Sequence, residues 1–195
     1  MDTIVDLFSL VCGQAPEHTW SPGGLGLPFC QRCSGLYAGA FFAALLHLLC
    51  RPRLSGRFLE IHGAFLLVMV PFGYHWVPQG PTLRAFTGVL FGFGVVTFLM
   101  LPLVETAVVR RWAWRKCDRE DAPRWAWRYF GGVLGASCLV PLLGTSGAAL
   151  AGFSLTSAAC AGAMILVMLV LLDASLGIRS AARVLRSRFQ GQAGA

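Results

Sequence analysis

Three cysteines near the start of the chain carry side chains that could do chemistry. Cys30 and Cys33 form a Cys-x-x-Cys pair, Cys12 precedes them, and His18 lies between. Thiolates bind soft and borderline metal ions, and they are also the reactive species in disulfide exchange. The grouping therefore predicts either a metal site or a redox-active thiol pair.

A helix that begins near Phe29 would position the pair. Residues three apart lie on one face of a helix, so Cys30 and Cys33 would point the same way. The unpaired N–H groups at a helix start favour thiolate over thiol, and the neighbouring Arg32 adds to that bias.

A metal ion would require further ligands. Zinc takes four ligands in a tetrahedron, of which Cys30 and Cys33 supply two and Cys12 a third. His18, or His75 at the outer end of the second predicted helix, is the candidate fourth ligand. Each histidine also has a simpler interpretation, His18 as a loop residue and His75 as part of an interfacial aromatic belt. Two of the thiols could instead form a disulfide that fastens the loop.

The rest of the sequence predicts an integral membrane protein. Hydrophobic residues make up 56% of the 195 residues and charged residues only 13%, a balance that requires lipid to cover the apolar surface. The net charge of +7 does not indicate nucleic-acid binding, because the basic residues cluster between apolar runs, where membrane orientation explains them.

Five apolar runs are long enough to cross a bilayer as helices, which predicts an all-α polytopic bundle. They cover approximately residues 34–50, 58–77, 84–109, 127–145 and 151–173. Prolines inside three of the runs are expected to kink the helices without breaking them, because neighbouring groups satisfy the freed carbonyls. Close helix contacts are predicted at Gly35-x-x-x-Gly39, Gly88-x-x-x-Gly92 and Gly131-x-x-x-Gly135.

The cationic residues predict the orientation. All but two of the 16 Lys and Arg residues follow the first, third or fifth run, and only Arg32 and Arg84 fall on the other side. Cytoplasmic loops are rich in Lys and Arg, so the N-terminus is predicted outside and the C-terminus in the cytoplasm. The cysteines are then extracytoplasmic, in a protein of the bacterial inner (plasma) membrane.

The chain divides into three predicted parts. Residues 1–33 form an extracytoplasmic interfacial helix and the cysteine loop, residues 34–175 the five-helix transmembrane domain, and residues 176–195 a basic cytoplasmic tail. The cytoplasmic loop 109–128 mixes cations with tryptophans and is expected to bind anionic lipid heads, with docking of a cytoplasmic partner as the alternative.

Besides His75, two histidines fall within the predicted spans, where ionisable groups are costly. His47 lies deep in the first helix and could serve in a relay or hydrogen-bond a neighbouring helix. His62 lies near a predicted cytoplasmic end, where lipid headgroups and arginines are expected to solvate it.

The residues around the cysteines resemble a known family. The motifs Cys12-x-Gln14-x-Pro16-Glu17 and Pro28-x-Cys30-x-Arg32-Cys33-x-Gly35-Leu36-Tyr37-x-Gly39 are similar to those of the bacterial and archaeal membrane proteins grouped as domain of unknown function 2085. The usual form in that family is Cys-His-Gln-x-Pro-x-Arg-Ser, followed by Cys-x-Arg-Cys-x-Gly-Ile-Tyr at the start of a membrane helix. The resemblance covers residues 12 to 39 closely and implies no activity.

This chain departs from the family form at two positions. Gly13 stands where the family usually has His, and His18 stands where it usually has Arg. If the family's Cys-His and Cys-x-x-Cys pairs form a metal site, this chain has lost one ligand, which His18 would replace five positions along.

Taken together, the residues predict a small membrane protein whose outer site binds zinc or copper for structure, sensing or transfer. The alternatives are a membrane thiol-disulfide oxidoreductase that exchanges electrons with a quinone, and a scaffold or channel subunit braced by a disulfide; a homo-oligomer or a membrane partner is compatible with each. Neither a phosphate loop, a nucleophile elbow, paired catalytic carboxylates nor a zinc-protease helix is present, so the sequence does not support a hydrolase or a transferase.

Overall fold

The protein is a bundle of membrane helices in the computed structural model, which describes residues 6, 12–24, 26–52, 54–74, 76–104 and 122–192. Among these residues are five α-helices, and each contains a segment long and apolar enough to cross a membrane. They are α2 (Gln31–Cys50), α3 (Gly56–Gly73), α4 (Pro81–Val104), α6 (Ala122–Thr145) and α7 (Ala149–Gln192). The described residues form no β-strand, so the all-α prediction with five spans is confirmed.

Local sequence sets the ends of the first two helices. Cys30, with an extended backbone, caps α2, and the Ser34 N–H donates to the Cys30 carbonyl at 2.8 Å. α2 ends at Cys50, because the next residue, Arg51, has a left-handed φ of 46°. The Ser55 side chain then accepts a hydrogen bond from the Phe58 N–H at 3.3 Å and begins α3.

The helices continue through the three prolines, as predicted. Pro71 lies inside α3, Pro102 inside α4 and Pro141 inside α6. The largest difference from the predicted spans is in α7, which continues as a helix to Gln192, beyond the end of the apolar run. The predicted interfacial helix, apart from Asp6, and residues 105–121 of the tryptophan-rich loop lie outside the described residues.

The centre of the bundle is the parallel pair α2 and α4, which packs against α6 and α7, with α3 against α4. A Cβ atom on Gly35 or Gly39 would overlap the backbone of α4, and one on Gly88 or Gly92 would overlap the backbone of α2. Two of the predicted small-residue contacts therefore face each other, as such motifs do in close membrane pairs. By contrast, a Cβ atom on either glycine of Gly131-x-x-x-Gly135 would meet open space.

The outer surface of the bundle is apolar. Large side chains such as Leu67, Leu142, Phe153 and Met164 are more than half exposed to the surroundings of the chain. On helices of this length, such side chains indicate contact with lipid. The protein is therefore an integral membrane protein.

A buried polar cluster joins four helices. The His62 ring is fully buried, its Nε2 lies 3.0 Å from the Tyr129 hydroxyl, and its Nδ1 lies 2.8 Å from the Phe58 carbonyl. Thr97 of α4 hydrogen-bonds the Tyr129 side chain and lies 3.4 Å from His47 Nε2. The expectation that headgroups solvate His62 is wrong, because α4 and α6 cover this face of α3.

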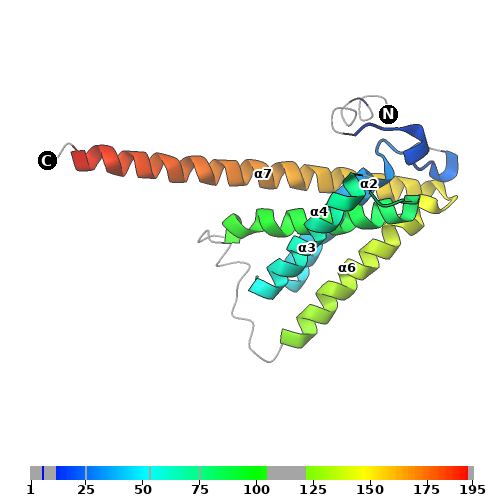
Figure 1. The fold of residues 1–195 in the computed structure, drawn as a ribbon, viewed down its shortest axis with the longest axis horizontal. Coiled ribbons are helices and arrows are strands. Elements are labelled where there is room, and N and C mark those ends of the chain that lie inside the picture. The colour runs from blue at the N-terminus through cyan, green and yellow to red at the C-terminus, as the bar shows by residue number, and fades with distance from the viewer. Residues whose placement is uncertain are drawn as a thin grey trace.

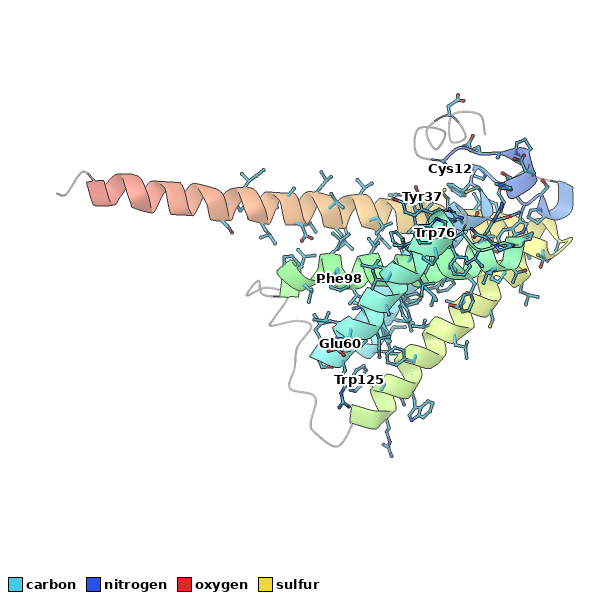
Figure 2. All side chains as sticks on the ribbon, in the orientation of Figure 1. Cys12, Tyr37, Glu60, Trp76, Phe98 and Trp125 are labelled. Atoms are coloured by element: carbon cyan, nitrogen blue, oxygen red, sulfur yellow. The ribbon has the colours of Figure 1, made fainter. Side chains whose placement is uncertain are left out.

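The N-terminal loop lies at the end of the bundle where α2 and α7 begin, which we call the cysteine end (Figure 1). It packs on the turn between α6 and α7, where Gly23 meets Ala149 and the Trp20 ring meets Gly144. Figure 2 shows Cys12 and Trp76 at this end, and Glu60 and Trp125 at the opposite end.

Candidate metal centre

The loop from Cys12 to Cys30 folds back on itself and returns Cys12 to the start of α2. The Leu27 N–H donates to the Trp20 carbonyl at 2.9 Å, and Thr19 pairs with Cys30 in an isolated antiparallel bridge. The Gln14 amide donates to the Pro28 carbonyl at 2.9 Å and ties the two arms of the loop together. The glycine-rich and proline-rich stretch thus brings Cys12 to the cysteine pair, as the sequence suggested.

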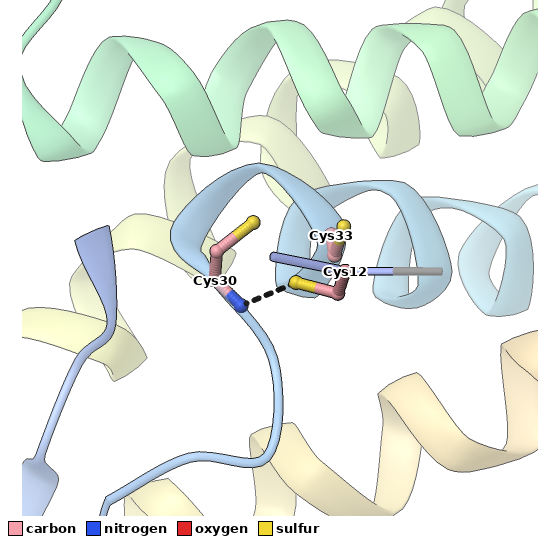
Figure 3. Close-up of side chains that lie close together, drawn as sticks. All are labelled: Cys12, Cys30 and Cys33. Atoms are coloured by element: carbon pink, nitrogen blue, oxygen red, sulfur yellow. Dashed lines mark hydrogen bonds between the residues drawn. The ribbon is translucent and has the colours of Figure 1, made fainter. Parts of the chain in front are cut away.

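The three thiols meet at the start of α2 (Figure 3). Their sulfur atoms all lie within 4.8 Å of one another. Cys30 caps the helix and Cys33 lies in its first turn, so the two side chains share a face. Cys12 is buried, and its Sγ accepts a hydrogen bond from the Cys30 N–H at 3.3 Å.

Hydrogen bonding within the cluster favours a thiolate at Cys30. The Cys33 thiol donates to the Cys30 sulfur, and this bond lowers the pKa of Cys30 to about 5. Burial opposes the shift, while the backbone N–H of Cys33, the Cys12 side chain and the N–H of Arg32 lower the pKa further. The cluster therefore holds one sulfur anion near neutral pH.

A cavity of about 240 Å³ opens beside the thiols. Besides the three cysteines, its walls include His18 and Gln14 from the loop and two arginines, Arg32 of α2 and Arg84 of α4. His18 ends a short 3-10 helix, Pro16–His18, and lines this cavity without joining the group of three sulfurs. The other predicted histidine ligand, His75, lies outside the described residues.

Arg84 is the residue of this cavity that sequence reasoning did not assign to the site. In the sequence it is only one of the two cations on the predicted outer side. The sequence still contains a hint that Arg84 is near the site, because the other outer cation, Arg32, lies within the Cys-x-x-Cys motif itself. The structure brings both arginines to the same cavity.

A scan against family models decides the relationship that the cysteine pattern suggested. Residues 12–98 match the family described as predicted membrane protein (DUF2085). The predicted resemblance is confirmed, and the DUF2085 match runs from Cys12 into α4, so it contains every residue that lines the cavity. α6 and α7 lie beyond the matched residues. No curated protein and no solved structure matches the chain.

The ligand set of this site suits a soft or borderline ion. Three cysteine sulfurs that lie within 4.8 Å of one another could hold one metal ion. Because such a site leaves a position open when the metal is four-coordinate, the adjoining cavity could supply a further ligand.

Proposed function

We propose that Cys12, Cys30 and Cys33 bind one zinc or copper(I) ion. The observation that carries this proposal is the approach of all three sulfurs to within 4.8 Å, although Cys12 comes from the far arm of the loop. A disulfide reaction needs only two of these thiols, and a third one held beside them favours a metal ligand set.

The backbone around Cys12 supports the same role. Cys12 is buried, and the hydrogen bond from the Cys30 N–H holds its sulfur beside the cysteine pair. His18, in the wall of the same cavity, is a candidate fourth ligand, and His75 remains the alternative fourth ligand.

We place the site on the outer face of a bacterial inner membrane. Arg51 and Arg57 lie at the end of the bundle opposite the cysteines, as do the helix ends that border the strongly basic loop after α4. The excess of cations on cytoplasmic loops supports this orientation. There the site would serve as a structural centre, a sensor, or a carrier that passes the ion to a membrane partner or a second copy of the chain.

Metal analysis of purified protein tests the proposal. After loading with zinc, or with copper(I) under reducing conditions, and removal of free metal, we expect one ion per chain. We expect less than about a tenth of that amount in each of the variants Cys12→Ser, Cys30→Ser and Cys33→Ser, because each lacks one of the three proposed sulfur ligands. Cys138→Ser is the matched control, since Cys138 lies in α6, outside the cluster.

Free-thiol counting on the same samples separates the alternatives. Full thiol reactivity without bound metal would contradict the metal proposal. Loss of two thiols to a disulfide, with no thiol-exchange activity, would instead support a structural staple in a scaffold or channel subunit.

The second candidate is a membrane thiol-disulfide oxidoreductase, favoured by the Cys30–Cys33 pair. Cys30 has a lowered pKa and Cys33 donates a hydrogen bond to it, an arrangement that suits a nucleophile and a resolving thiol. Oxidation of a substrate dithiol by a Cys30–Cys33 disulfide would reduce the pair by two electrons, and a quinone would have to reoxidise it. In Cys33→Ser, a mixed disulfide trapped on Cys30 would support this function, and its absence would count against it.

A further inference from the structure

The cavity beside the thiols is lined by cationic groups and by no carboxylate among the described residues. Arg32 comes from the first turn of α2 and Arg84 from the first turn of α4. Because α2 and α4 are parallel, with Gly35 against Ala85 and Gly39 against Val89, both helices begin at this end. The partial positive charges of two helix starts therefore add to the two guanidinium groups.

Both guanidinium groups keep hydrogen-bond donors available. The Nε atom of Arg84 is buried and has no hydrogen-bond partner. Arg32 donates through Nη2 to the Phe72 carbonyl at 2.8 Å and to Gln79 Oε1 at 3.2 Å, while its own Nε has no partner. Buried donors without an acceptor are costly, so both arginines have unmet hydrogen-bonding capacity at the wall of the cavity.

We propose that this cavity binds a small organic anion, whose carboxylate is held by Arg84 and Arg32 while its other end lies against the Cys30 sulfur. The volume of about 240 Å³ has room for a molecule of several non-hydrogen atoms. Arginine presents paired donors in a plane, which suits a carboxylate.

The inference rests on the proposed function in that it names the ligand class of the same site. Three thiolates around Zn²⁺ carry a net charge of about −1, so an anion bound beside them would bring the total to about −2, which two arginines neutralise. Recognition of the anion by the arginines does not itself require the metal, so the two proposals can fail separately.

The test compares two alkylating reagents of similar size on metal-free protein. Iodoacetate carries a carboxylate and iodoacetamide a neutral amide; with each, the Cys30 thiolate forms an S–C bond as iodide leaves. The rate of modification at Cys30, measured by peptide mass analysis, gives an iodoacetate-to-iodoacetamide ratio for each variant. We expect Arg84→Gln to lower this ratio about tenfold, and Arg84→Lys to keep most of it.

Arg57→Gln is the matched control. It removes one exposed cation at the opposite end of the bundle, so the ratio should not change. Wild-type protein gives a second readout that needs no variant, because screening by added salt should lower its ratio toward that of free cysteine.

A ratio that neither Arg84→Gln nor salt alters would overturn the anion site, whatever the metal content of the protein. A ratio that falls as expected in a protein that binds no metal would leave the anion site standing and would count against the metal proposal alone.

Discussion

The Nε2 atom of His62 lies 3.0 Å from the hydroxyl of Tyr129, a residue 67 positions away in the chain. His62 Nδ1 is paired with the Phe58 carbonyl, so in the neutral ring Nδ1–H donates and Nε2 accepts from the tyrosine. This hydrogen bond ties α3 to α6, and Thr97 adds α4 to the same cluster. It fixes the relative rotation of these helices at the end of the bundle opposite the cysteines.

Tyr129→Phe should destabilise the bundle while leaving its packing intact. The substitution removes the hydroxyl and leaves His62 Nε2 buried without a donor, so we expect a loss of about 1 kcal/mol, within the range of hydrogen bonds between membrane helices. Thermal unfolding in detergent measures the effect. Trp127→Phe, at a side chain that is 82% exposed, is the control and should have little effect; equal stability of Tyr129→Phe and wild type would show that the bond contributes nothing.

Gly39→Ala should separate α2 from α4. The new methyl group would overlap the backbone at Val89, and overpacking of this kind costs about 1–3 kcal/mol. Gly135→Ala places the same methyl group in open space on α6 and should change stability by less than about 0.5 kcal/mol. Thermal unfolding of the two variants side by side provides the comparison, and equal effects would contradict the assigned contact.

The reaction rate of Cys30 should depend weakly on pH above about 6. Because the pKa of Cys30 is lowered to about 5, its thiolate is formed as pH rises through 5 and is nearly complete by pH 7. An ordinary thiol reacts roughly 75-fold faster at pH 8 than at pH 6, whereas Cys30 in metal-free protein should change less than about twofold. Iodoacetamide labelling followed by peptide mass analysis measures both rates. A steep rise between pH 6 and 8 would disprove the lowered pKa.

Reporter fusions should place the C-terminus in the cytoplasm. The basic residues that follow α2, α4 and the apolar part of α7 predict that a green fluorescent protein fused after residue 195 will fluoresce, while alkaline phosphatase fused there will be inactive. The opposite pattern would place the cysteines on the cytoplasmic side, where a reducing environment disfavours a disulfide.

The sequence predicts the spans well because the length and hydropathy of a run are local properties. The gathering of the three cysteines was also predictable, since residues 12–33 form one short loop rich in glycine and proline. Even so, the predicted span starts at the polar Ser34, whereas α2 already begins at Gln31, close to the helix start near Phe29 that the cysteine spacing indicates.

Contacts between distant helices were not predictable in the same way. The partner of His62 depends on which faces of α3 and α6 meet. The length and hydropathy of an apolar run do not determine this. Arg84 meets the cysteines for a similar reason, because the glycine contacts between α2 and α4 set which turn of α4 faces the motif. From one sequence, hydropathy predicts how deep such a residue lies in the membrane, but it does not predict which residue of another helix lies beside it.

The length of α7 has a mechanical consequence. Its 44 residues extend about 66 Å at 1.5 Å per residue, roughly twice the thickness of the hydrocarbon layer. Figure 1 shows its last turns running on past the other helices. The end of α7 therefore extends as a single helix beyond the packed part of the bundle, while its first residues support the cysteine loop.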